Sequence, residues 1–192
     1  MMVLFLVAEL CGLTFRDRDS SKSNVIATVL FGDGAAAALL AAEGGDDNGT
    51  APRLSRAGEH TWPDSLDVMG WRIEDDGFGV LFSQDIPSLV AREMPAVLDD
   101  YLDAHGLGLD DYDGFVCHPG GAKVVAALEQ VFGLAPDGLV HARGVLRDYG
   151  NMSAATVMFV LDRFIADRRA GRYLMSALGP GFSVGFLTLE IP

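Results

Sequence analysis

The stretch DGFVCHPGGAKVVAALEQVF, residues 113–132, decides the fold class, because it passes from strand to turn to helix. Residues 113–117 predict a short apolar strand that leads directly to His118. A Pro-Gly-Gly turn follows, and apolar residues then recur at helical spacing over residues 122–132. Proteins built from alternating strands and helices place reactive side chains at such strand ends, in loops held by a rigid scaffold. His118 is therefore the first candidate for a functional residue.

The alternation of strands and helices continues on both sides of this stretch and indicates an α/β fold. The strongest helix signal covers residues 86–105, with Asp85 as the expected N-cap and Pro87 in the first turn. The other predicted elements are strands at 66–74, 79–83, 173–178 and 183–190, and helices at 24–31 and 152–169.

The first 52 residues predict a strand, a helix and a return into the core. We expect the opening strand, residues 3–10, to be buried because it is almost wholly apolar. Residues 31–34 (FGDG) predict a tight turn, after which residues 35–42 run back into the core. Residues 43–52 are rich in Gly and Asp, so they predict the main linker of the chain and an internal boundary.

The composition narrows the class of partner. The formal net charge of −13 argues against binding to nucleic acid or to an anionic membrane surface. Apolar residues make up 49% of the chain, which indicates a globular protein, yet no apolar run approaches the ~20 residues of a membrane helix. Glu9 ends the opening apolar run, which has no basic region before it, so we expect no signal peptide and a cytoplasmic location.

The two cysteines, Cys11 and Cys117, are too few for a disulfide framework. Each ends an apolar, strand-like run, so we expect both to be reduced and buried. Cys117 and His118 are adjacent and therefore poorly placed to share a metal ion, and we expect no metal site.

Asn151 is the second candidate for a functional residue, in the segment Gly150-Asn151-Met152-Ser153. An Asn at the start of a helix is an ordinary N-cap, and a lone His in a turn can be structural, so neither residue is diagnostic by itself. A neutral imidazole and a side-chain amide are both hydrogen-bond donors. Donors aimed at one carbonyl oxygen stabilise an enolate or oxyanion as its charge develops. The pair of His118 and Asn151 therefore predicts a carbonyl-activating site.

Four motifs in this order resemble those of the type III polyketide synthases, the chalcone and stilbene synthase family of thiolase-like enzymes. The resemblance extends from about Val3 to Glu190 and implies a thiolase-like fold of αβαβα layers. The motifs are LFGDGAA at 30–36, CHPGG at 117–121, YGNMS at 149–153 and GPGF at 179–182.

In that family a Cys–His–Asn triad extends an acyl-CoA starter with malonyl-CoA. The Cys takes up the acyl group, and the His and Asn hold the malonyl thioester carbonyl while CO2 is lost. The resemblance gives the His and Asn roles to His118 and Asn151, and it implies CoA thioesters as substrates with no further cofactor. The other implied positions are Phe31 as the gatekeeper between CoA tunnel and cavity, Phe82 beside it, Ser153 in the cavity wall, Gly179, Pro180, Gly181 and Phe182 in the pocket loop, and Lys123 against the CoA phosphates.

The nucleophilic Cys of the family lies upstream of the segment that begins at Val3. Cys11 is a poor substitute, because it ends a strand and lacks the small-residue-Cys-Ser turn into a helix. Cys117 points away from its neighbour His118, since adjacent strand residues face opposite sides. The resemblance thus implies that residues 1–42 are the last part of the N-terminal half and that residues 43–192 are the complete C-terminal domain.

Three interpretations follow. In the first, the chain is the C-terminal part of a synthase and needs the missing N-terminal segment, joined to it or supplied by a companion chain, with a homodimer as the full-length form. In the second, it is a non-catalytic partner subunit or binding module. In the third, it belongs to the related ketoacyl carrier-protein synthase III group. We expect low solubility or tight association for the chain alone, because a thiolase half exposes apolar surface without its twin.

Overall fold

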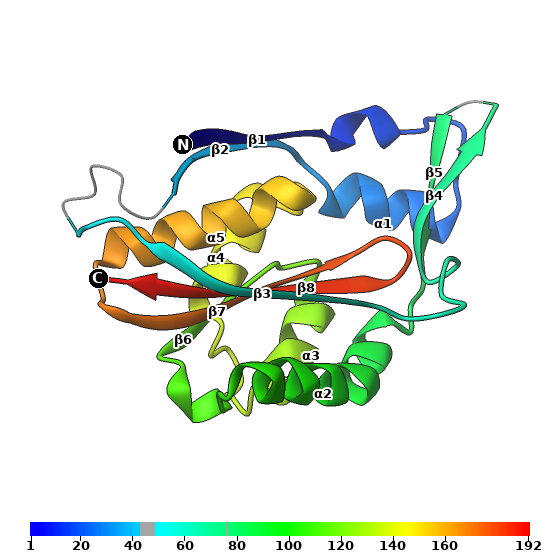
Figure 1. The fold of residues 1–192 in the computed structure, drawn as a ribbon. Helices are drawn as coiled ribbons and strands as arrows, with labels where there is room; N and C mark the ends of the chain where they lie inside the picture. Colours follow the sequence, from blue (N-terminus) through cyan, green and yellow to red (C-terminus); the bar gives the residue numbers. More distant parts are fainter. Residues whose placement is uncertain (43–48, 76) are drawn as a thin grey trace.

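The chain folds into alternating layers of sheet and helix in the computed structural model, which describes residues 1–42, 49–75 and 77–192 (Figure 1). The strands are β1 (Met2–Leu10), β2 (Asp33–Ala41), β3 (Arg53–Thr61), β4 (Met69–Glu74), β5 (Gly77–Phe82), β6 (Gly114–Cys117), β7 (Gly171–Gly179) and β8 (Ser183–Ile191). The helices are α1 (Lys22–Leu30), α2 (Ile86–His105), α3 (Ala122–Val131), α4 (Val140–Tyr149) and α5 (Ala154–Asp167), with 3-10 turns η1 (Cys11–Thr14) and η2 (Leu109–Asp111).

The central sheet has the strand order β3-β8-β7-β6, with β6 parallel to β7 and the other pairs antiparallel. Helices α2 and α3 lie on one face, and α4 and α5 lie on the other (Figure 1). On the first face the Tyr101 ring of α2 lies 5.1 Å from Phe186, and its hydroxyl is 2.8 Å from the hydroxyl of Thr188. On the second face Phe164 of α5 lies 5.2 Å from Tyr173. Both faces of this sheet are therefore buried.

Strands β1 and β2 form a separate antiparallel pair, in which Leu4 lies opposite Leu39. One face of the pair packs on α5, which lies between the two sheets (Figure 1). Strand β1 occurs where the sequence predicts it, and residues 35–42, predicted only to return to the core, form most of β2. The predicted burial of both segments is wrong, because Leu4 and Leu39 are each 65% exposed. Among the described residues, helices cover this pair on one side only, so an apolar sequence here does not become a core strand.

The helix predicted at 86–105 is confirmed as α2, and Pro87 lies in its first turn. The predicted side-chain cap is wrong: Asp85 occupies the N-cap position, but its carboxylate accepts no capping hydrogen bond. Its backbone carbonyl instead accepts from the N–H of Leu89 at 2.8 Å. The predicted turn at 31–34 is also wrong, because Phe31 is extended and leads directly into β2.

The sequence pattern predicted neither β3 nor α4. Strand β3 is an edge strand with mostly polar side chains, so it lacks the apolar run that marked the other strands. Of the predicted linker, residues 43–48 lie outside the described residues. Residue 76 lies outside them too; it belongs to the segment DDG, residues 75–77, which the sequence predicts as a turn between two strands. None of the helices in the described part of the chain has the length and apolar character needed to cross a bilayer.

Candidate active site

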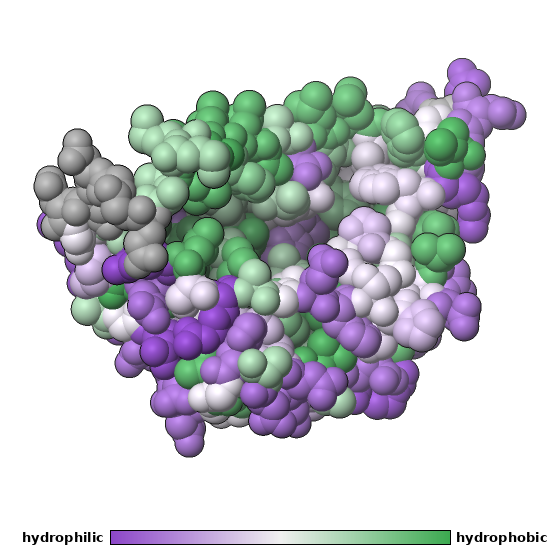
Figure 2. Space-filling view, in the orientation of Figure 1, coloured by the Kyte–Doolittle hydropathy of each residue, from purple (hydrophilic) through white to green (hydrophobic). Residues whose placement is uncertain are grey.

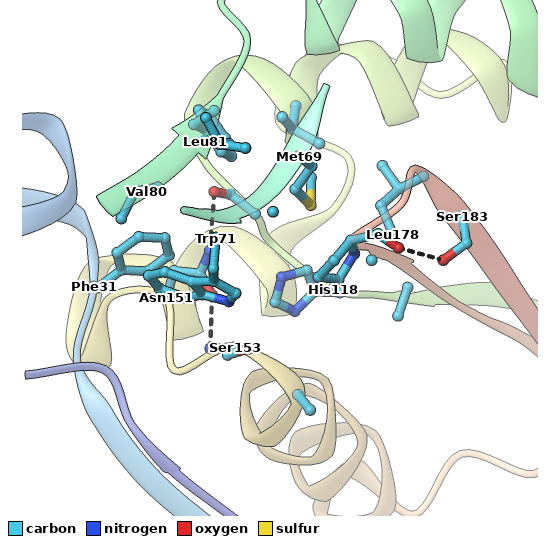
Figure 3. Close-up of a pocket in the computed structure, with 18 of the residues that line it drawn as sticks. Phe31, Met69, Trp71, Val80, Leu81, His118, Asn151, Ser153, Leu178 and Ser183 are labelled. Atoms are coloured by element: carbon cyan, nitrogen blue, oxygen red, sulfur yellow. Dashed lines mark hydrogen bonds between the residues drawn. The ribbon is translucent and has the colours of Figure 1, made fainter. Parts of the chain in front are cut away.

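His118 and Asn151 border one cavity of about 330 Å3, which lies where the end of β6, the hairpin β4–β5 and the start of α5 meet. Figure 3 shows both side chains projecting into this cavity, with Phe31 next to Asn151. Phe82 and Ser153 also border it. Gly179 and Pro180 border it too, so the fold brings together seven of the predicted site residues from distant parts of the sequence.

The backbone of His118 is fixed by the central sheet. Its N–H donates to the carbonyl of Ser176 at 2.8 Å, which continues the β6–β7 pairing by one residue. The Pro-Gly-Gly turn then leads into α3. Burial lowers the pKa of His118 to about 4. The imidazole is therefore neutral at neutral pH, so it can donate one N–H to a ligand without carrying a positive charge.

The backbone of Asn151 is fixed by the N-terminal part of the chain. Its N–H donates to Leu30 at 2.8 Å, and its carbonyl accepts from the N–H of Gly32 at 3.0 Å. These two bonds flank Phe31 and hold it beside Asn151 as an isolated parallel bridge. Gly150 allows this contact: its φ is +72°, and a Cβ there would lie 2.7 Å from the Leu30 carbonyl oxygen.

The side-chain amide of Asn151 is oriented by three hydrogen bonds. Its Oδ1 accepts from the N–H of Ser153 at 2.8 Å and from the Thr156 hydroxyl at 3.5 Å, and its Nδ2 donates to the Gly120 carbonyl at 3.2 Å. With the oxygen occupied in this way, the second N–H of the amide is left for a ligand. The alternative in which Asn151 is an ordinary N-cap is excluded, because α5 begins at Ala154 and Ser153 holds the cap position. Ser153 has a positive φ of 51°, an uncommon conformation for a residue with a side chain.

Aromatic side chains form one wall of the cavity. Phe31 and Phe82 border it as predicted, and so does Trp71 of β4, whose ring lies 6.3 Å from that of Phe31. Trp71 was missed at the sequence level, although it lies inside a predicted strand. A signal was present in the sequence. Trp71 is a large aromatic residue in the first strand of a short hairpin, and the second strand ends at Phe82, which was already a predicted cavity residue.

A second cavity, of about 520 Å3, lies on the other side of Phe31 and Phe82. Both phenylalanines border both cavities, as do Val80 and Val124. Lys123 borders only the second cavity, so the structure separates it from His118 and Asn151. Lys22 at the start of α1 borders the second cavity too, so both lysines of this acidic chain line the same hollow.

The predicted pocket loop divides between the cavity and the core. Gly179 and Pro180 border the first cavity, but Gly181 and Phe182 do not. Phe182 is 2% exposed, and its ring lies 4.9 Å from that of Trp62. Its bulk therefore supports the loop from behind and does not reach a ligand in the cavity.

Both cysteines are free and buried, as predicted. Cys11 borders the first cavity, and burial, helped by the charges of Glu9 and Asp33, raises its pKa. Cys117 does not border the cavity, and burial raises its pKa to about 12. Because the thiolate is the reactive form, neither residue is activated as a nucleophile.

Comparisons of the sequence with known proteins match this chain to one family and to named synthases. Residues 53–190 match the family described as chalcone and stilbene synthases, C-terminal domain. A putative chalcone synthase of Bacillus subtilis (strain 168) is 44% identical over 188 residues, covering 94% of this chain and 52% of that protein. A 1,3,6,8-tetrahydroxynaphthalene synthase of Streptomyces peucetius subsp. caesius is 38% identical over 193 residues, covering 97% and 50%.

Among solved structures, the crystal structure of PKS-I from the brown algae Ectocarpus siliculosus superposes on the whole of this chain and on 53% of its own, with a TM-score of 0.90. At 24% identity this similarity shows the fold alone, and it confirms the predicted thiolase-like α/β class. The family match identifies the chain itself: it belongs to the chalcone and stilbene synthase family and covers the C-terminal half of a type III polyketide synthase. The chain spans about half the length of the curated relatives it matches.

Proposed function

We propose that this chain supplies the carbonyl-activating part of a type III polyketide synthase site, in which His118 and Asn151 bind the thioester oxygen of malonyl-CoA. The observation that carries the proposal is that a neutral imidazole and an oriented amide border one aromatic-walled cavity. Both groups donate to an oxygen, and neither supplies a proton that would quench the enolate early.

In the proposed reaction, the bond between the malonyl α-carbon and the carboxylate breaks and CO2 leaves. The electron pair of that bond passes into the thioester as an enolate, whose oxygen accepts hydrogen bonds from His118 and Asn151. The enolate carbon then attacks the carbonyl of an acyl thioester, a carbon–carbon bond forms, and the thiolate leaves. The acyl thioester forms on a cysteine outside this chain, because neither Cys11 nor Cys117 is activated.

The second cavity supports CoA thioesters as substrates. Lys22 and Lys123 border it, and phosphate groups carry the negative charge that such lysines attract. Phe31 and Phe82 lie between this cavity and the one bordered by His118, which supports the gatekeeper role that the family resemblance gives to Phe31. Lys22 and Lys123 would then hold the CoA phosphates in the second cavity. The acyl group of the thioester would pass between Phe31 and Phe82 into the first cavity.

The experiment is to measure CO2 release from malonyl-CoA, both by the chain alone and by the chain co-expressed with the upstream half of the Bacillus subtilis relative. We expect His118→Gln and Asn151→Ala each to reduce release by about 10²–10³-fold, because each removes one donor to the enolate oxygen. His105→Gln, at the end of α2, is the matched control and should leave the rate unchanged. Full activity in the His118 and Asn151 variants would contradict the proposal.

A second candidate function is a non-catalytic binding module, which the lack of an activated thiol favours. Binding of malonyl-CoA without CO2 release, in both preparations, would support it. The ketoacyl carrier-protein synthase III alternative predicts that an acyl carrier protein, and not CoA, delivers the acyl group. Comparing the two donors at equal concentration distinguishes that alternative from the CoA-dependent reaction.

A further inference from the structure

Thr156 is a polar residue in the interior of a chain that exposes apolar ones. Hydrophobic residues gather at the surface over β1 and β2 (Figure 2), whereas Thr156, in the first turn of α5, is fully buried. Burial of a hydroxyl is unfavourable unless the hydroxyl forms hydrogen bonds. In the described part of the chain, all of its hydrogen-bond partners lie in residues 151–153, the segment that carries Asn151.

The Thr156 hydroxyl is bonded on both sides. Its oxygen accepts from the N–H of Met152 at 2.8 Å, and it donates to the carbonyl of Ser153 at 2.8 Å. Asn151 Oδ1 lies 3.5 Å from the same oxygen. Because a hydroxyl carries one proton, the shorter contact with Ser153 is the stronger of the two. Thr156 therefore acts mainly on the backbone of residues 152 and 153.

Ser153 needs this support because its backbone conformation is strained. Its φ is 51° and its ψ is −131°, a combination that residues with a side chain rarely adopt. The hydroxyl of Ser153 makes no capping bond at the start of α5. Thr156, three residues later, instead reaches back to the N–H of the residue before the cap position, much as the last residue of a capping box does.

The strained turn determines how the Asn151 amide lies. The N–H of Ser153 donates to Asn151 Oδ1 at 2.8 Å (Figure 3), so this end of the amide is the oxygen. The nitrogen at the other end donates to the carbonyl of Gly120 at 3.2 Å, in the turn that follows His118. A relaxed Ser153 would turn its N–H away from Oδ1 and leave the amide free to rotate. The second N–H of the amide would then no longer be held for a ligand in the cavity.

We propose that Thr156 is a positioning residue for the reaction: its hydroxyl holds Ser153 in the strained conformation that fixes the Asn151 amide. Thr156 does not border the first cavity, so it acts only through Asn151. The proposal rests on the proposed function for the reaction that Asn151 serves. The hydroxyl is the part of the side chain that matters, so serine should replace threonine and valine should not.

The first test observes the amide itself, without any thioester. The chain contains three asparagines, so labelling them selectively with heavy nitrogen gives three pairs of side-chain amide signals in an NMR spectrum. The Asn151 pair is the one that disappears in Asn151→Asp. We expect Thr156→Val to shift this pair and to speed its exchange with water by about 5-fold or more, because the amide loses its fixed partner. Thr156→Ser should keep the wild-type spectrum.

The Asn24 amide, in α1, is an internal control for folding. It donates to the carbonyls of Arg16 and Asp19 at 2.8 and 2.7 Å, and Asn24 does not border the first cavity. Its signals should stay in place in every Thr156 variant. If Thr156→Val moves them as well, Thr156→Ala is compared with Thr156→Ser in the same way, since neither adds bulk.

Thr188→Val is the matched control variant. Thr188 of β8 is also fully buried, and its hydroxyl is 2.8 Å from the hydroxyls of both Tyr101 and Tyr112. Its loss should lower stability, because two buried hydroxyls lose a partner. It should leave the Asn151 signals unchanged, since Thr188 contacts no part of residues 151–153 through its hydroxyl.

The second test measures CO2 release from malonyl-CoA by the chain co-expressed with the upstream half of the Bacillus subtilis relative. We expect Thr156→Val to lower kcat by about 10–100-fold and to change KM by less than about 2-fold, because a displaced donor weakens the transition state more than substrate binding. Thr156→Ser and Thr188→Val should keep a kcat close to that of the wild type.

Unchanged Asn151 signals in Thr156→Val, or equal losses of kcat in the valine and serine variants, would overturn the proposal. An equal loss of kcat in Thr188→Val would also overturn it, since lowered stability would then explain both. A wild type that releases no CO2, with Asn151 signals that still depend on Thr156, contradicts only the proposed function. A wild type that releases CO2, with a normal kcat in Thr156→Val, contradicts only the positioning role.

Discussion

Strand β7 of the central sheet and the β1–β2 pair both contain runs of apolar residues, yet these runs have opposite surroundings. In the central sheet, Leu174 of β7 is fully buried, because helices lie on both faces. In the β1–β2 pair, Leu39 is 65% exposed, because α5 covers one face and no other described helix covers the second. Strand sequence alone thus does not decide burial; the number of covered faces does.

The largest expected effect contrasts these two leucines. Leu174→Ala should lower the free energy of unfolding by about 3 kcal/mol or more, since it removes buried methyl groups and leaves a cavity. Leu39→Ala should change it by less than about 0.5 kcal/mol in the chain alone. Urea unfolding of both variants measures the difference. Similar losses in the two would show that the exposed face of the β1–β2 pair is buried in solution, by self-association or otherwise.

A smaller effect is expected at the backbone contact that joins the two regions. Gly150→Ala should destabilise the chain by about 2–3 kcal/mol, because the φ of +72° is retained and the new Cβ meets the Leu30 carbonyl oxygen. Gly133→Ala is the matched control, with a φ of +65° and nothing within 4 Å of the added Cβ, and should cost about 1 kcal/mol. Thermal unfolding measures both. Equal losses of stability in the two variants would mean that the contact between the new Cβ and the Leu30 carbonyl does not contribute to the destabilisation.

The pH dependence of stability tests the burial of His118, at the end of the central sheet. Its pKa is about 4 in the folded chain, below its ordinary value near 6.5. Between these values the unfolded chain binds a proton that the folded chain does not, so stability falls as the pH falls from about 6.5 to 4. The ring opens into the cavity, which reduces the effect, and we expect a loss of about 1–2 kcal/mol.

Urea unfolding at several pH values measures this loss, and His118→Gln is the comparison because glutamine does not titrate. The variant should lose less stability than the wild type over the same interval. Identical pH profiles would contradict the lowered pKa.

The smallest expected effect concerns the lysines, one from each region. Lys22 begins α1, the helix between β1 and β2 in the chain, and Lys123 lies in α3, beside the central sheet. Each of Lys22→Ala and Lys123→Ala should weaken CoA binding by about 3–5-fold, an effect that high salt reduces. Titration calorimetry at two salt concentrations measures this, with Lys22→Arg as the charge-preserving control. Unchanged affinity in both alanine variants would exclude the second cavity as a phosphate site.

Much of the central region could be predicted from sequence because its signals are local. The strand at 113–117, the turn after His118 and helix α2 each depend on periodicity, glycine and proline within one short segment. The burial of β1 could not be predicted, because it depends on which layers lie above it. Helix α4 was missed, although Gly150 at its end was identified as part of a motif.

The same distinction applies to the candidate site. The sequence motifs identify His118 and Asn151 as a pair. The structure agrees, because tertiary contacts bring both residues to one cavity. The orientation of the Asn151 amide could not be predicted, because its partners Ser153 and Gly120 are fixed only in three dimensions. The separation of Lys123 from the first cavity depends in the same way on Phe31 and Phe82 lying between the two.

The bridge between Phe31 and Asn151 makes the position of the Asn151 amide independent of the size of the side chain at position 31. The bonds that hold the two residues together use only main-chain atoms, from Leu30 and Gly32 to Asn151. The side chain at position 31 is thus free to vary in size without moving the amide beside it. Under the proposed function, a substitution at position 31 would change what enters the cavity and leave the two donors in place.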